Sequence, residues 1–237
     1  MKVISLASVR GAPGVTTTAI LLASTYTDGL VVEADLDGGV LAIRYGLGRE
    51  PGLTTFAAGG PDADGDWRAH AQDAGGVPVL VGPDAPAAST SIWRTAGERI
   101  THKLVAADGV TIVDAGRLRS PVPIVAASDL LAVLVNPVAD QLVALTHLVP
   151  TLRQAVRGRV AVVLVGDGPY GADDVERAVG VSVIGHLPYD HDAAEVLRVG
   201  GSRSRLARSQ LARAVGALGG ALSSVLFEPT TTAVAAS

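Results

Sequence analysis

Short aliphatic runs of strand length recur along the chain, separated by stretches in which apolar residues have helical spacing. The runs lie at residues 3–9, 29–35, 77–81, 109–114, 130–135, 160–165 and 181–184. Runs that are apolar on both faces are typical of parallel strands covered by helices on both sides. The pattern predicts an α/β fold: a doubly wound, mostly parallel sheet of about seven strands with helices on both faces.

The length and composition suit one domain, because 237 residues with 48% hydrophobic side chains can bury a large core. We expect residues 1–226 to form this domain and residues 227–237, rich in Thr and Ala, to be a disordered tail. The polar, aperiodic segment 57–76 is expected to be a mobile excursion. The formal net charge of −4 provides no global attraction to nucleic acid or to an anionic membrane.

The sequence contains no cysteine, which excludes disulfides and thiolate metal sites. Its apolar runs are shorter than the roughly 18 residues of a membrane-spanning helix, so no stable membrane insertion is expected. The first apolar run breaks at Arg10 and Gly11, before the core of a signal peptide would be complete. We interpret the chain as cytoplasmic.

A glycine-containing loop joins the first predicted strand to the first predicted helix, and it reads Arg10-Gly11-Ala12-Pro13-Gly14-Val15-Thr16-Thr17. Gly11 and Gly14 permit positive φ, so that successive N–H groups can point at an anion. The following helix adds its positive N-terminal end. Thr16 lies where a phosphate-binding loop provides a hydroxyl ligand for Mg²⁺. The stretch therefore predicts a phosphate-binding loop.

One position departs from that pattern. A general P-loop has lysine directly after its last glycine, where the charge meets the terminal phosphates, and this chain has Val15. The only lysines are Lys2 and Lys103, and neither is near the loop in sequence. The alternative interpretation is a glycine turn that merely connects a strand to a helix.

Acidic residues follow other predicted strands at their carboxyl ends, where sites of doubly wound sheets lie. Glu33, Asp35 and Asp37 end the second run, and Asp114 ends the fourth. A Pro188-Tyr189-Asp190 turn follows the last run. We expect these groups to meet the glycine loop at one edge of the sheet.

These motifs, in this order, resemble the ParA/MinD group of P-loop ATPases, the deviant Walker A proteins of the SIMIBI class, whose loop reads Lys-Gly-Gly-x-Gly-Lys-Thr-Thr. Residues 31–37 resemble the switch I strand of that group, with Glu33 in place of its first Asp. Residues 111–116 resemble its Walker B strand and switch II. Residues 184–190 resemble its last strand and the turn that packs on adenine.

The resemblance implies ATP or ADP and Mg²⁺ as cofactors and a homodimer as the assembly. Thr16, Asp35 and Asp114 would serve the metal, and Asp35 and Arg10 would be catalytic, with Arg10 in place of the lysine that contacts the partner subunit's nucleotide. The implied nucleotide-binding residues are Arg10, Gly11, Ala12, Pro13, Gly14, Val15, Thr16, Thr17, Pro188 and Tyr189. The adenine-reading Asn of the group is absent, and Asp167 is either its replacement or a solvated loop residue.

The implied function is a dimerising positional switch that localises DNA or a macromolecular machine, together with an unknown partner protein. Because Val15 removes a charge that stabilises phosphoryl transfer, ATP hydrolysis is expected to be weak or lost. One alternative is a nucleotide-independent pseudo-ATPase scaffold for pilus or secretion machinery, as in TadZ/CpaE-like proteins. Another is a nonspecific DNA-binding partition module that uses Arg203, Arg205 and Arg208, although these arginines also suit a solvated helix face.

Overall fold

The computed structural model describes residues 1–11, 14–59, 66–199, 206 and 208–227. Its centre is an eight-stranded sheet in the order β3-β4-β2-β5-β1-β6-β7-β8. The pairs are parallel except for β3 and β4, which are antiparallel. The strands are β1 (Lys2–Ser8), β2 (Gly29–Glu33), β3 (Gln72–Asp73), β4 (Pro78–Leu80), β5 (Val110–Arg117), β6 (Leu130–Val135), β7 (Arg159–Val165) and β8 (Val183–Leu187).

The predicted fold class is confirmed, and the strand count is eight rather than about seven. The additional strand is β3, which is two residues long and lies inside the segment expected to be mobile. A strand this short has no period that the sequence could reveal. Within the same segment, the Trp67 side chain is 4% exposed and packs in the core, so residues 66–76 are integrated into the domain.

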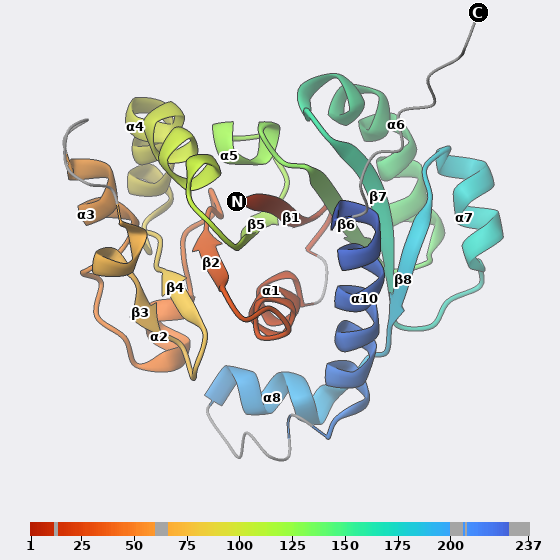
Figure 1. Ribbon diagram of the computed structural model, residues 1–237. Helices are drawn as coiled ribbons and strands as arrows, with labels where there is room; N and C mark the ends of the chain where they lie inside the picture. The colour runs from red at the N-terminus through yellow and green to blue at the C-terminus, as the bar shows by residue number, and fades with distance from the viewer. Residues whose placement is uncertain (12–13, 60–65, 200–205, 207, 228–237) are drawn as a thin grey trace, which may run out of the picture.

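Helices cover both faces of the sheet (Figure 1). One face carries α3 (Leu53–Ala58), α4 (Pro86–Ala106), α5 (Pro123–Ala126), α6 (Ala139–Ala155) and α7 (Ala172–Val179). The other face carries α1 (Val15–Ala23), α2 (Leu41–Tyr45), α8 (His191–Val199) and α10 (Gln210–Phe227). A 3₁₀ turn, η1 (Trp67–His70), precedes β3.

Each face of the sheet has its own apolar core, because successive strand residues point to opposite sides. In β6, Leu131 and Val133 belong to the core beneath α4 and α6, whereas Ala132 and Leu134 belong to the core beneath α1 and α10. The strand is therefore apolar at every position, which is why its sequence reads as an uninterrupted aliphatic run.

The last helix, α10, packs against α1 and β8. Its Val215, Leu218 and Leu222 are buried, and a Cβ atom added to Gly185 of β8 would lie 3.0 Å from Leu218. These contacts confirm that the apolar side of this helix is buried against the domain. Helix α10 includes Phe227, and the remainder of the expected tail lies outside the described residues, so its disorder stays a prediction.

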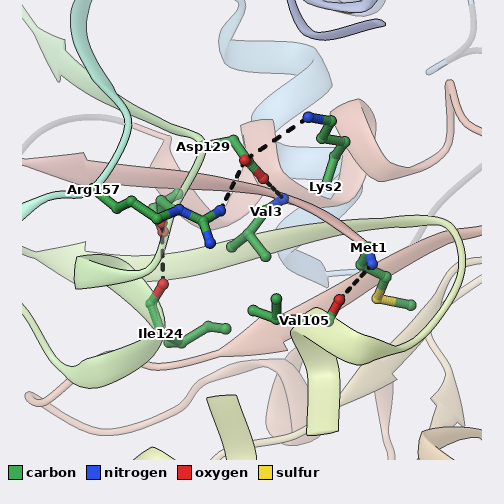
Figure 2. A network of polar contacts seen from close by, with 9 residues as sticks. Met1, Lys2, Val3, Val105, Ile124, Asp129 and Arg157 are labelled. Carbon is green, nitrogen blue, oxygen red and sulfur yellow. Dashed lines mark hydrogen bonds and ion pairs between the residues drawn. The ribbon is translucent and has the colours of Figure 1, made fainter. Parts of the chain in front are cut away.

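A polar network fastens the strand ends opposite the carboxyl edge of the sheet (Figure 2). The Asp129 carboxylate accepts a hydrogen bond from the Val3 backbone N–H at 2.9 Å and forms an ion pair with Arg157 at 2.8 Å. The Lys2 amine lies 3.9 Å from the same carboxylate. The Asp129 side chain, which directly precedes β6, thereby joins the start of β1 to the segment before β7. None of the helices in the described part of the chain is both long enough and apolar enough to span a membrane.

Candidate nucleotide-binding site

A cavity of about 410 Å³ opens at the carboxyl edge of the sheet, where the central strands β1 and β5 end. Five segments contribute to its walls: the glycine loop with the start of α1, the loop after β2, helix α2, the end of β5, and the turn between β8 and α8. The predicted motifs therefore meet in one place. Its lining includes Gly11, Gly14, Val15, Thr16, Thr17, Asp35, Arg44, Gly116, Arg117, Pro188 and Tyr189.

Both glycines of the loop have the positive φ that an anion-binding loop requires. Gly11 and Gly14 have φ values of 40° and 87°, in the left-handed region that favours glycine. Gly14 is the N-cap of α1, and no side chain caps this helix. The first N–H groups of α1 have no intrahelical acceptor and point toward the cavity end of the helix, where an anion can accept their hydrogen bonds. Ala12 and Pro13 lie outside the described residues.

Val15 begins α1 and lines the cavity, but its side chain is only 5% exposed and belongs to the core beneath α1. Apolar packing at this position provides no charge to the loop. Any binding of phosphate here therefore depends on backbone N–H groups, on the hydroxyls of α1 and on cations from other segments.

Thr16 and Asp114 meet beneath the loop. The Asp114 carboxylate accepts a hydrogen bond from the Gly116 backbone N–H at 3.1 Å, and the Thr16 side chain is close enough to lower the pKa of Asp114. Asp114 is 1% exposed, and desolvation by burial raises its pKa to about 6, against the lowering effect of these two contacts. A buried carboxylate with a raised pKa beside a hydroxyl is suited to a bound cation, which would restore the ionised form.

Asp35 lies on the loop after β2 and also lines the cavity. Burial raises its pKa, while the Asp37 backbone N–H donates a hydrogen bond to it at 2.8 Å. It packs directly on the end of β5, since a Cβ atom added to Gly116 would lie 1.9 Å from an Asp35 carboxylate oxygen. Asp35 and Asp114 are close enough for Asp35 to raise the pKa of Asp114. The two predicted metal-binding acids are therefore neighbours, with Asp35 in the cavity wall and Asp114 buried beside it.

Glu33 is 1% exposed and holds the loop that carries Asp35. Its carboxylate accepts hydrogen bonds from the backbone N–H groups of Val40 (2.5 Å), Leu41 (2.9 Å) and Gly82 (2.9 Å). Burial raises the pKa of Glu33 to about 7, and the charge of Asp114, its register partner on β5, adds to this rise. Sequence reasoning identified Glu33 only as a replacement for an acid and missed this positioning role.

Arginines lie at the site from two directions. Arg119 forms an ion pair with Asp37 at 2.9 Å, which links the loop after β5 to the loop after β2. Arg117 at the end of β5 is exposed and lines the cavity. Arg44 of α2 also lines the cavity and is half-buried. No motif in the sequence indicated Arg44.

The turn after β8 completes the opposite wall. Pro188 lines the cavity, and Tyr189 does so with a side chain that is 69% exposed. Asp190 fixes this turn, because its carboxylate accepts hydrogen bonds from the backbone N–H groups of Ala193 (2.9 Å) and Leu211 (3.3 Å), near the starts of α8 and α10. An exposed aromatic ring beside the cavity is a surface on which a planar base can stack.

Three of the described residues predicted for the site, Asp114, Arg10 and Asp167, are not among those that line the cavity. Arg10 is exposed at the start of the glycine loop, and its role toward a second subunit stays a prediction. Asp167 is exposed in the loop after β7, outside the lining, so its role in adenine recognition stays a prediction. Of the three arginines expected to contact DNA, Arg208 is exposed, and Arg203 and Arg205 lie outside the described residues.

The donor set fits Mg²⁺ bound together with phosphates. In the described part of the chain there is no group of three or more His, Asp or Glu side chains that could enclose a metal. Mg²⁺ does not need one, since it keeps several waters and binds through one or two protein oxygens plus phosphate oxygens. Thr16 and Asp35 provide such oxygens in the cavity wall, and Asp114 provides them from its buried position beside Thr16.

Searches with the sequence find no matching protein-family model and no matching curated protein. Solved structures do match the fold. A ParA family ATPase from Chlorobium tepidum superimposes with a TM-score of 0.75 at 20% identity, over 92% of this chain and 97% of that one. The septum site-determining protein MinD of Pyrococcus horikoshii, complexed with Mg-ADP, gives a TM-score of 0.75 at 15% identity, over 95% and 97%.

MinD of Aquifex aeolicus gives a TM-score of 0.70 at 17% identity, over 94% of this chain and 96% of that one. These matches span nearly the whole length of each protein, so the likeness extends to the full domain and not to a shared sheet alone. At such identities they establish the fold. The chain has the fold of the ParA and MinD ATPases.

Proposed function

We propose that this protein binds an adenine nucleotide with Mg²⁺, dimerises in the nucleotide-bound state and acts as a positional switch, with weak or lost ATP hydrolysis. The observation that carries the proposal is the contact between Thr16 and Asp114 directly beneath the glycine loop. A hydroxyl and a buried carboxylate that meet at the open end of a helix are the parts from which a Mg²⁺–phosphate site is built.

The cavity is large enough for a nucleotide, since its 410 Å³ lies within the range of about 300–1,000 Å³ typical of small-molecule sites. The missing lysine at position 15 removes one charged hydrogen bond, worth about 1.5–3 kcal/mol. That loss lowers affinity by roughly 10- to 150-fold, which weakens binding without abolishing it. We therefore expect micromolar to sub-millimolar affinity.

Hydrolysis is expected to suffer more than binding. The lysine of a P-loop stabilises charge that develops on the phosphoryl group during transfer, and a buried valine cannot replace it. Arg10, as the substitute for the signature lysine, keeps a charge at the entrance of the loop, but its planar guanidinium is not equivalent to an ammonium group. Slow turnover would hold the protein in the bound, dimeric state for longer.

The buried, apolar environment of Val15 also favours a second candidate function. If phosphates do not bind, the same domain serves as a nucleotide-independent scaffold that recruits a component of a pilus or secretion machine. Binding of nucleotide distinguishes the two candidates directly.

The test is calorimetric titration of the purified protein with ATP and with ADP in the presence of Mg²⁺. Val15→Lys is titrated in parallel, and Val143→Lys is the matched control, because Val143 is 57% exposed on α6 and remote from the loop. Sedimentation with and without Mg-ATP measures dimerisation. We expect wild-type binding, tighter binding by Val15→Lys, no change in Val143→Lys, and a dimer that forms with ATP.

No detectable binding by the wild-type protein, with binding restored in Val15→Lys, would instead support the scaffold. Rapid ATP turnover by the wild-type protein would contradict the proposal that hydrolysis is weak. A partner is then sought among proteins that bind the ATP-loaded form, with the ADP-loaded form as the reference.

A further inference from the structure

Helix α2 carries Arg44 at the cavity, and two contacts fix the start of this helix. Leu41 is fully buried in the core beneath α1, and Glu33 accepts the N–H groups of Val40 and Leu41. Arg44 follows Leu41 by three residues and therefore shares its side of the helix. Ile43 points away, with 76% of its surface exposed.

The end of α2 is equally well defined. Gly46 adopts φ 62° as its C-cap, and the Leu47 N–H donates to the Ala42 carbonyl at 2.8 Å. Both ends of the helix are therefore fixed by hydrogen bonds. Arg44 is carried on a short, rigid element rather than on a mobile loop.

The guanidinium of Arg44 is available to an anion. Among the residues that the structure describes, it has no hydrogen bond or ion pair, whereas Arg119 is paired with Asp37 and Arg49 with Asp84. It is close enough to Asp114 to favour the ionised carboxylate. A half-buried guanidinium with five donors that lines the cavity is suited to a phosphate group.

Val15 and Arg44 line the same cavity from different elements. We propose that Arg44 supplies, from α2, the phosphate-binding cation that a P-loop lysine would supply from position 15. The inference rests on the proposed nucleotide site and adds to it a residue that compensates for Val15. Arg117 also lines the cavity, but it is exposed at the end of β5.

The experiment is a double-mutant cycle on the full chain, with ATP and ADP affinities measured by calorimetry in Mg²⁺. The variants are Arg44→Gln, Val15→Lys and the double variant, and melting curves check that each one folds. Arg49→Gln is the matched control, because Arg49 is exposed and pairs with Asp84 on the surface. Arg44→Lys forms a separate arm that does not depend on tolerance of lysine at position 15.

We expect Arg44→Gln to raise the Kd for ATP by about 10- to 150-fold, the effect of losing one charged hydrogen bond. In the Val15→Lys background the same substitution should change the Kd by less than about threefold, because position 15 then carries the charge. The Kd of Arg44→Lys for ATP should stay within about tenfold of the wild-type value. The Kd of the control variant Arg49→Gln should equal the wild-type value.

Other outcomes overturn the inference in distinct ways. If the wild-type protein binds ATP and Arg44→Gln binds equally well, Arg44 is not a phosphate ligand, while the proposed nucleotide site stands. If Arg44→Gln lowers ATP affinity equally in the wild-type protein and in Val15→Lys, the two positions act independently. That result would refute the proposal that Arg44 compensates for Val15. If the wild-type protein binds neither ATP nor ADP, the proposed site fails and the inference falls with it.

Discussion

The Thr16 side chain lies beside the buried carboxylate of Asp114 and lowers its pKa, so the first turn of α1 meets the end of β5. These two residues are separated by almost one hundred positions in sequence, and they meet because β1 and β5 are neighbours in the sheet. The relationship partly satisfies a buried acid, and under the proposed function it prepares a cation site.

Removing the hydroxyl at position 16 should therefore weaken both stability and binding. Thr16→Ala leaves the buried Asp114 carboxylate short of one donor, which we expect to cost about 1–3 kcal/mol of unfolding free energy. Mg²⁺-dependent ATP affinity should fall by about tenfold or more. Thr16→Ser should retain both properties, and Thr54→Ala, exposed on α3, is the control. Urea unfolding and calorimetry check these values, and an unchanged Thr16→Ala protein would refute the coupling.

The stability of the metal-free protein should depend on the ionisation of Asp114. Its pKa is about 6 in the folded state, above the ordinary 3.8, so the folded state binds more protons than the unfolded state between these values. The contribution of Asp114 to stability is therefore present at low pH and is lost as the pH rises through about 6.

Asp114→Asn removes this titration. The unfolding free energy of the variant, relative to wild type, should rise by about 3 kcal/mol between pH 4 and pH 7, the equivalent of about two pKa units. Urea unfolding in EDTA at a series of pH values measures the difference. A difference that stays constant with pH would contradict the predicted shift.

Gly116 should tolerate no side chain. It has φ 53°, and an added Cβ would lie 1.9 Å from a carboxylate oxygen of Asp35. Gly180 is the matched control, because it also has positive φ (75°) but no atom lies within 4 Å of its added Cβ. Gly180→Ala should cost about 1–2 kcal/mol, the price of the left-handed conformation alone. Gly116→Ala should cost at least about 2 kcal/mol more, because Asp35 must move. Equal costs by urea unfolding would show that Asp35 moves freely.

The Asp129 network predicts a stability effect remote from the cavity (Figure 2). Asp129→Ala leaves the Val3 N–H without its acceptor and Arg157 without its partner, and we expect a loss of about 1–3 kcal/mol. Asp84→Ala is the control, because it removes a surface ion pair with Arg49 that is worth at most about 1 kcal/mol. Nucleotide affinity should not change in either variant. Similar unfolding midpoints for the two variants would contradict the proposed role of Asp129.

DNA binding, if present, should be electrostatic. Three arginine–phosphate contacts would make log K fall against log salt with a slope of about −2 to −3. Joint replacement of Arg203, Arg205 and Arg208 by Gln should remove both the affinity and the slope, whereas Arg94→Gln on α4 should not. Fluorescence anisotropy with a duplex over a range of KCl concentrations tests this. A flat response in the wild-type protein would leave these arginines as solvated surface.

The fold class could be predicted because local pattern and tertiary position agree. A strand such as β6 is buried on both sides, so every residue of it is apolar and the run is legible in the sequence. Strand β3, which is two residues long, left no such signal. Its existence depends on contacts with distant segments rather than on local propensity.

By itself, the sequence determined the strand–loop–helix motif, the absence of a lysine at position 15 and the acids at the strand ends. These features are local, because they follow from residue type and spacing along a few positions. Only the tertiary structure decided that Glu33 would hold the start of α2, that Asp35 would pack on Gly116 and that Arg44 would face the cavity. Each of these contacts depends on which strands are neighbours in the sheet and on which side chains remain exposed to the cavity. The order of residues along the chain does not specify such three-dimensional proximity.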